Sequence, residues 1–176
     1  TGFLQEVPEV SNSDQPGGFH HVAYACRDIH ENHRFYEDLI GLELVKTEVT
    51  PYGEGFFRHT FYDTGDGSCL AFFDLHGVGE EDKDRTGIST GLGMPLWVNH
   101  IALKRNEEQT AVISGRLNEA GHGTYTLEHG WCRSTYVTDP NGISLEFCVD
   151  TPGFEPDRQR ALELFDAVPE GTAKVV

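Results

Sequence analysis

Four residues of this chain have types and positions that suit the binding of a metal ion. They are two histidines, His21 and His100, and two carboxylates, Asp74 and Glu146. Glu146 gives the clearest signal, because apolar residues alternate through 143–149 and leave its carboxylate on the opposite face of a predicted strand. A carboxylate in an apolar strand is costly to bury without a cationic partner. A cationic side chain or a bound metal ion would supply that partner.

Imidazole and carboxylate ligands together suit Fe(II), Mn(II), Co(II), Ni(II) or Zn(II). Small residues, Ala23 and Ala102, lie two positions beyond the histidines and leave room between strands. Two histidines with one or two carboxylates would leave coordination positions open for water or substrate. Taken singly, each histidine also fits a structural role and each acid an ion pair. Their equivalent positions in a repeat favour the metal site.

The elements that must hold these residues occur twice in the same order. The pattern of the first half predicts a strand over 19–27, a helix over 29–40 between Asp28 and Gly41, and strands over 42–49, 56–63 and 68–75. The pattern of the second half predicts a strand over 96–104, a helix over 107–120, and strands over 123–128, 132–139 and 143–149. Each half thus offers one histidine on its first strand and one acid on its last.

The two halves also match in sequence. Residues 19–25 match 98–104, and residues 69–75 match 142–147 with Asp74 aligned on Glu146. We therefore predict an α+β fold with two βαβββ modules in one domain over 19–150. Module 1 spans 19–75, a linker or lid spans 76–95, and module 2 spans 96–150. Residues 1–18 are predicted to form an N-terminal arm, and residues 151–176 a C-terminal extension with a short helix.

Composition limits the classes of function. The formal net charge of −16 argues against binding nucleic acid or an anionic membrane surface. No run of about 18 apolar residues predicts a membrane span, and no secretory signal is visible. Four cysteines, at 26, 69, 132 and 148, form no Cys-x-x-Cys pair. They fit reduced core residues of a cytoplasmic protein.

Several motifs resemble those of the vicinal oxygen chelate superfamily, which groups glyoxalase I, bleomycin and fosfomycin resistance proteins and extradiol dioxygenases. They are His21-Val-Ala-Tyr-Ala-Cys-Arg-Asp28, Phe35-Tyr36-Glu-Asp-Leu-Ile-Gly41-Leu, Asn99-His100-Ile-Ala-Leu and Asp139-Pro-Asn-Gly-Ile-Ser-Leu-Glu146. The resemblance implies an open eight-stranded barrel-like cup around one divalent metal ion. It assigns the ligand positions to His21, His100 and Glu146, and a glyoxalase I-type site would add Asp74.

The segment from His129 to Glu146 is similar to the extradiol dioxygenase signature, which sets a histidine and a tyrosine before the Asp-Pro turn and the ligand glutamate. The similarity implies that Tyr136 hydrogen-bonds a bound catecholate or a developing oxyanion. It implies that His129 orients the substrate or transfers a proton. An ordinary cross-strand tyrosine and a loop histidine without a role are the alternatives.

We therefore expect a metal-dependent enzyme, first of all an extradiol-type dioxygenase with Fe(II) and a small aromatic or enediol-like substrate. Ligation by Asp74 would instead favour glyoxalase I-type isomerase or lyase chemistry, in which Mn, Ni, Co or Zn could serve. A non-catalytic resistance protein that binds small molecules ranks third. We expect a homodimer, with the C-terminal helix packed on the domain or on the partner subunit.

Overall fold

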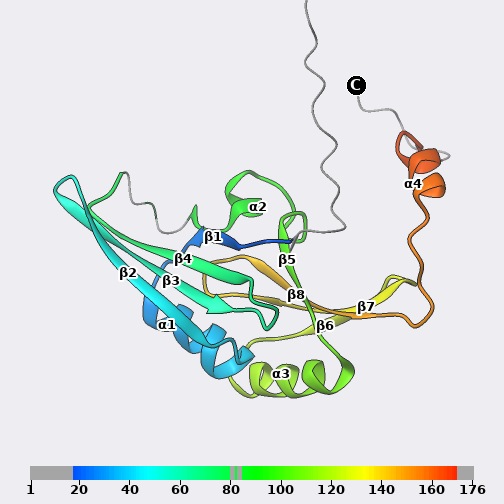
Figure 1. Cartoon of the computed structure of the whole chain (residues 1–176), viewed down its shortest axis with the longest axis horizontal. Helices are drawn as coiled ribbons and strands as arrows, with labels where there is room; N and C mark the ends of the chain where they lie inside the picture. Colours follow the sequence, from blue (N-terminus) through cyan, green and yellow to red (C-terminus); the bar gives the residue numbers. More distant parts are fainter. Residues whose placement is uncertain (1–17, 80–81, 83–84, 170–176) are drawn as a thin grey trace, which may run out of the picture.

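The fold consists of two modules with the same order of elements (Figure 1). The computed structural model describes residues 18–79, 82 and 85–169. The first module contains β1 (His21–Ala25), α1 (Ile29–His33), η1 (Arg34–Ile40), β2 (Leu44–Tyr52), β3 (Gly55–Asp63) and β4 (Cys69–His76). The second contains β5 (His100–Lys104), α3 (Glu107–Glu119), β6 (Tyr125–Glu128), β7 (Cys132–Thr138) and β8 (Ser144–Asp150). The prediction of two βαβββ modules is confirmed.

Hydrogen bonding divides the eight strands into two four-stranded mixed sheets. Their strand orders are β1-β4-β3-β2 and β5-β8-β7-β6. Strand β1 runs parallel to β4, and β5 runs parallel to β8. The remaining neighbours are antiparallel. Each parallel pair brings the start of a module next to its end, which is where the candidate ligands lie.

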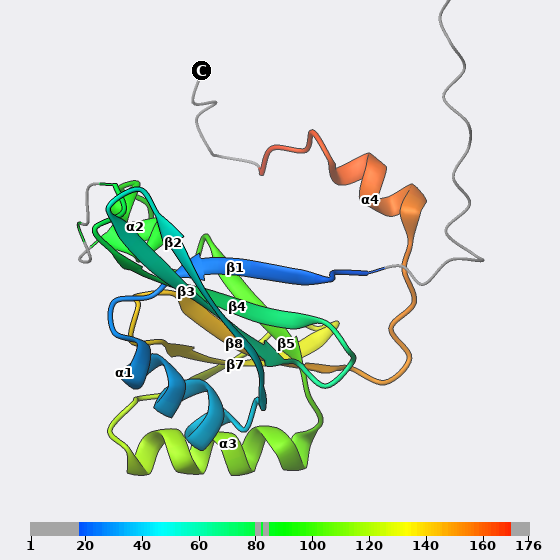
Figure 2. The same cartoon turned by 60° about the vertical axis from the view of Figure 1, so that its left-hand side comes forward.

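Helices α1, η1 and α3 lie together and cover one face of the sheets (Figure 2). One hydrophobic core joins both modules there, and Tyr36, Phe72, Leu117, Leu145 and Phe147 are among its fully buried members. The Tyr36 hydroxyl of the first module donates a 2.8 Å hydrogen bond to Asp139 of the second. The two modules are therefore held together through their helix-covered faces.

The opposite face of each sheet is not covered by α1, η1 or α3. In β1, exposed His21, Ala23 and Ala25 alternate with half-buried residues that face the core. In β5, His100 and Ala102 are exposed while Leu103 is buried in the core. Both candidate histidines thus lie on uncovered faces.

The structure refines several predicted boundaries. The predicted helix over 29–40 is α-helical only to His33 and continues as the π-helical η1, which ends at Gly41 with a positive φ of 88°. The predicted linker contains a short helix, α2 (Ile88–Gly91), whose Ser89 hydroxyl accepts a hydrogen bond from the backbone N–H of Asn99. Strand β5 begins at His100 and not at residue 96.

The C-terminal extension contains the expected helix, α4 (Arg158–Leu164), which buries no residue and lies apart from the sheets (Figures 1 and 2). Asp157 caps its first turn through the backbone N–H of Arg160. Within the described residues, no helix is long and apolar enough to cross a membrane. Most of the predicted N-terminal arm, residues 1–17, lies outside the described residues.

Candidate metal centre

His100 and Glu146 meet on the uncovered face of the second sheet. Strands β5 and β8 are parallel neighbours, with Ala102 opposite Glu146. This register sets His100 one alternation from Glu146, so both side chains point to the same side. The His100 Nε2 atom lies 3.1 Å from Glu146 Oε2. The Glu146 side chain is 7% exposed and that of His100 is 38% exposed, so the pair lies at the bottom of an open face.

The backbone fixes the orientation of the His100 ring. Its Nδ1 atom lies 3.0 Å from the Trp97 carbonyl oxygen, which can only accept a hydrogen bond. The Nδ1 position is therefore the protonated one, and in the neutral ring Nε2 carries the lone pair. Metal-binding histidines use this arrangement, in which the distal N–H is held by a carbonyl or carboxylate.

Ser134 holds the other oxygen of the carboxylate. The Ser134 hydroxyl, fully buried in β7, donates a hydrogen bond to Glu146 Oε1. Oε2 is left facing His100. Ser134 and His100 thus hold the two oxygens of Glu146. Among the described residues, His100 is the only basic side chain that pairs with this carboxylate. A metal ion bound by both His100 Nε2 and Glu146 Oε2 would neutralise the buried carboxylate.

The distance between the two ligand atoms fits such an ion. Two ligands at about 2.1 Å from a divalent metal and at right angles to each other lie about 3.0 Å apart. The separation of His100 Nε2 and Glu146 Oε2 is 3.1 Å. The pair therefore has the spacing of two adjacent positions in a coordination polyhedron without any rearrangement.

Tyr136 and His129 lie on the same face as this pair. Tyr136 is opposite Glu146 in the β7–β8 ladder, and its ring lies 6.5 Å from that of His100. His129 Nε2 lies 2.9 Å from the Tyr136 hydroxyl, and the Tyr125 ring stacks on the Tyr136 ring at 5.2 Å. Burial raises the pKa of Tyr136 above its ordinary value of 10.0, and the nearby Glu146 carboxylate adds to the rise. The phenol therefore stays protonated near neutral pH and can donate a hydrogen bond.

His21 does not join His100 and Glu146 within one chain. In the described residues, only Cys132, Glu146 and Cys148 form a group of three or more His, Cys, Asp or Glu ligand atoms within 4.8 Å of one another. His21 instead lies 5.9 Å from the His59 ring and 5.4 Å from the Phe61 ring, measured between centroids. These three residues share the uncovered face of the first sheet. Burial lowers the pKa of His59, and the charge of His21 adds to this.

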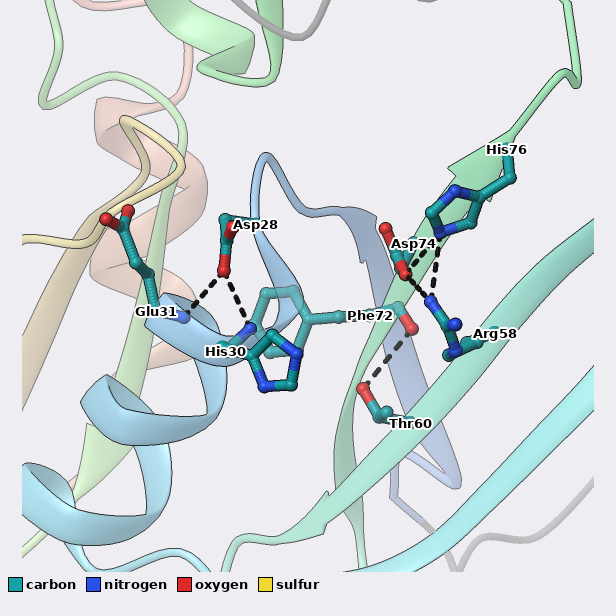
Figure 3. A network of polar contacts seen from close by, with 8 residues as sticks. All are labelled: Asp28, His30, Glu31, Arg58, Thr60, Phe72, Asp74 and His76. Carbon is teal, nitrogen blue, oxygen red and sulfur yellow. Dashed lines mark hydrogen bonds and ion pairs between the residues drawn. The ribbon is translucent and has the colours of Figure 1, made fainter.

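Asp74 points to the other face of the first sheet. Its partner in the β3–β4 ladder is Arg58. Phe72, two positions earlier in β4 and therefore on the same face as Asp74, packs in the helix-covered core. The Asp74 carboxylate lies 2.5 Å from Arg58 Nη1 and 2.7 Å from His76 Nε2, and it is 4% exposed (Figure 3). The structure therefore separates Asp74 from His21 by the thickness of the sheet and gives its charge other partners. Asp74 therefore does not meet His100 and Glu146 within one chain.

The strand registers explain why the repeat match misplaces Asp74. His21 pairs with Cys69 in β4, and His100 pairs with Ser144 in β8. By this register the position equivalent to Glu146 is Ala71, which pairs with Ala23 as Glu146 pairs with Ala102. Asp74 lies three positions after Ala71 in β4, and an odd number of positions places its side chain on the opposite face.

Sequence reasoning missed Trp97, Ser134 and the two cysteines beside Glu146. The contact made by Trp97 uses its backbone carbonyl, and no residue type signals that. Ser134 and Cys132 do share a parity with Tyr136 along β7, so alternation alone could have placed them on the Glu146 face.

The comparisons agree with this fold. The profile of the Glyoxalase/Bleomycin resistance protein/Dioxygenase superfamily matches residues 18–147. This chain belongs to that superfamily. It is 30% identical over 131 residues to "Putative ring-cleaving dioxygenase MhqA" of Bacillus subtilis, a match that covers 71% of this chain and 41% of MhqA. It is 40% identical over 65 residues to "Putative ring-cleaving dioxygenase MhqE" of the same organism, covering 36% and 22% of the two chains.

Solved structures show the same architecture. A glyoxylase/bleomycin resistance protein/dioxygenase domain from Frankia sp. EAN1pec superposes with a TM-score of 0.58 at 19% identity, covering 80% of this chain and 96% of the other. A dioxygenase of Bacillus subtilis, described as putative, superposes with a TM-score of 0.56 at 22% identity, covering 75% of this chain and 40% of the other. The chain thus spans about two fifths of the length of MhqA.

Proposed function

We propose that this protein is a divalent-metal oxygenase that cleaves the ring of a small aromatic diol. The observation that carries the proposal is the His100–Glu146 pair, at the spacing of two metal ligands, on one face with the Tyr136–His129 pair. The names of the two Bacillus relatives support ring cleavage as the reaction. Fe(II) is the ion we assign first, because histidine and carboxylate ligands with open positions suit iron-dependent oxygenases; Mn, Ni, Co and Zn are the other candidates.

A bound ferrous ion would be held by His100 and Glu146 and would supply the redox chemistry that a reaction with O₂ requires. The residues of this chain supply orientation and proton transfer. The Tyr136 phenol, protonated at neutral pH, can donate a hydrogen bond to an oxygen of the bound diol. His129, in hydrogen-bond contact with that phenol, can pass a proton between it and solvent. The substrate diol would lie over the uncovered face between these two pairs.

His21 is proposed as the third ligand, contributed by a second copy of the chain. Within one chain its imidazole is too far from His100 and Glu146 to share an ion with both. Its exposed position on an uncovered sheet face leaves it accessible to another copy. The Glu146 face is equally uncovered, so a homodimer can set the β1 face of one copy against the β5–β8 face of the other. Each dimer would then contain two equivalent sites.

A mixing experiment tests this arrangement. His21→Ala and His100→Ala proteins would each be inactive alone, since every site lacks a ligand. A mixed dimer of the two contains one site with both substitutions and one with neither, so mixing should restore up to about half of the activity per mixed dimer. If mixing restores nothing while the proteins are shown to exchange subunits, the shared site is contradicted.

Oxygen uptake tests the reaction class. After anaerobic loading with Fe(II), the protein should consume O₂ with one or more substituted catechols and yield a ring-opened acid. The isomerase or lyase alternative predicts turnover of a hemithioacetal with nickel or zinc and no oxygen uptake. The fourth ligand that this alternative requires, Asp74, is paired with Arg58 and His76. Binding of a small molecule without any bound metal would support the third reading, a non-catalytic binding protein.

A further inference from the structure

Two free cysteines lie beside Glu146. Cys132 is the first residue of β7, and Cys148 lies two positions after Glu146 in β8. Their sulfur atoms and a Glu146 oxygen all lie within 4.8 Å of one another. Among the residues that the structure describes, this is the only group of three or more histidine, cysteine or acidic ligand atoms at that spacing.

The strand pairing fixes the backbone of all three residues. In the antiparallel β7–β8 ladder, Ser134 is opposite Cys148 and Tyr136 is opposite Glu146. Alternate residues of both strands therefore face the same side, and Cys132 follows as the next alternate residue of β7. No loop has to fold over for the two sulfur atoms and the carboxylate to converge.

The cluster is buried and polar. Cys132 is fully buried and Glu146 is 5% exposed. The Ser134 hydroxyl lies among the three groups, 3.5 Å from Cys132 Sγ and 3.8 Å from Cys148 Sγ, and it donates to Glu146 Oε1. One small polar atom can thus contact all three at once, which a ligated ion must also do.

We propose that Cys132, Cys148 and Glu146 form a binding site for a thiophilic divalent ion such as Zn²⁺ or Cd²⁺. Two thiolates and a carboxylate are ligands that zinc accepts in tetrahedral sites, and the softer sulfur atoms select against Mg²⁺ and Ca²⁺. A tetrahedral ion with metal–sulfur bonds of about 2.3 Å holds its ligand atoms about 3.5–3.8 Å apart. Small side-chain rotations reach this from the present spacing, and the Ser134 hydroxyl or a water can take the fourth position.

The site shares Glu146 with the metal centre proposed above. Ser134 donates to Glu146 Oε1, whereas His100 faces Oε2. The cysteine site requires neither His21 nor His100. The proposal therefore stands or falls independently of the proposed oxygenase activity, and a His100→Ala protein tells the two sites apart.

Titration of the reduced apoprotein with Cd²⁺ tests the site. We expect one equivalent of Cd²⁺ per chain to produce the ultraviolet charge-transfer band of cadmium thiolate, with release of protons from the two thiols. Cys132→Ser and Cys148→Ser should each weaken this binding at least about tenfold. Cys69→Ser, which changes a cysteine in β4 away from the cluster, and His100→Ala should leave the band unchanged.

A second measurement on the unaltered chain covers the case that a cysteine variant does not fold. Bound Cd²⁺ should protect the partly exposed Cys148 from alkylation, as read by peptide mass spectrometry, and should leave the labelling of partly exposed Cys69 unchanged. The absence of a thiolate band at one equivalent, or the same labelling of Cys148 with and without Cd²⁺, overturns the proposal.

Discussion

His100 Nε2 lies 3.1 Å from Glu146 Oε2, and the two residues come from the first and last strands of the same module. The parallel pairing of β5 with β8 produces this approach, and the Trp97 carbonyl and the Ser134 hydroxyl orient the two side chains. The same face holds the Tyr136 phenol and the His129 imidazole. Each of these contacts leads to a measurable expectation.

Replacement of Tyr136 by phenylalanine should lower kcat about 100-fold and leave the metal content unchanged. The substitution removes a hydroxyl that donates to the substrate and keeps the buried ring. Steady-state oxygen uptake and elemental analysis of the same preparation would measure both quantities. Tyr125→Phe is the matched control, because its ring stacks on Tyr136 while the residue is 53% exposed, and it should behave like the unaltered protein. A Tyr136→Phe protein with full kcat would remove the phenol from the reaction.

His129→Gln should lower kcat by a factor similar to that of Tyr136→Phe, and the double variant should lose little more than either single one. The reason is that the two side chains lie 2.9 Å apart and are expected to act as one unit. A double-mutant cycle on kcat measures the coupling. Fully multiplicative losses would show that the two residues act separately.

Asp74→Asn should lower the free energy of unfolding by roughly 1–3 kcal/mol, because it weakens a buried carboxylate's contacts with Arg58 and His76. It should leave metal binding unchanged, because Asp74 faces away from His21. Chemical denaturation and metal titration would report the two effects. Asp150→Asn makes the same change in the exposed pair with Lys104 and should cost less than about 0.5 kcal/mol. Loss of metal binding in the Asp74→Asn protein would instead support the hypothesis that Asp74 is a fourth metal ligand.

Tyr36→Phe should destabilise the protein more at pH 7 than at pH 4. Burial raises the pKa of Asp139 above its ordinary value of 3.8, and the Tyr36 hydroxyl is one of the groups that oppose this rise. A raised pKa means that the folded protein binds this proton more readily than the unfolded chain, so the stability contribution of Asp139 is complete below pH 3.8 and is lost as the pH rises through the folded-state pKa.

Without the Tyr36 hydroxyl, the ionised Asp139 carboxylate loses a hydrogen bond. The free energy of unfolding at pH 7 should fall by about 1.5–3 kcal/mol, which is the contribution of a hydrogen bond to a charged group. A larger fraction of the carboxyl is protonated at pH 4 than at pH 7, because the pKa of Asp139 is raised, so the loss at pH 4 should be smaller. Urea denaturation at the two pH values would measure the difference. An equal loss at both would mean that the hydroxyl does not act through the charge of Asp139.

The sequence was sufficient to predict the modules and the face on which Glu146 lies. Asp28 and Gly41 bound the first helical segment as predicted, and the alternation of 143–149 puts Glu146 opposite the core residues Leu145 and Phe147. These features are local, because capping and strand parity depend on neighbouring residues. The π-helical η1 was not predicted, since its apolar spacing also fits an α-helix.

The arrangement of strands relative to each other was harder to read. Asp74 matched Glu146 only when the acids were aligned on each other, whereas the pairing of His21 with Cys69 puts Ala71 in that place. A one-residue error in register turns a side chain to the other face, and no local pattern fixes the register of a parallel pair formed across a whole module. The position of His21 relative to His100 depends on how the modules pack, which strand patterns do not specify.

The most direct test of the metal centre is the Fe(II) content of anaerobically reconstituted protein, measured by equilibrium dialysis and elemental analysis. The unaltered chain should bind one ion, and both His100→Ala and Glu146→Gln should bind it at least about 100-fold more weakly. His30→Ala, which removes an exposed histidine of α1 outside the site, should match the unaltered chain. A Glu146→Gln protein that binds iron as tightly as the unaltered chain would contradict the account.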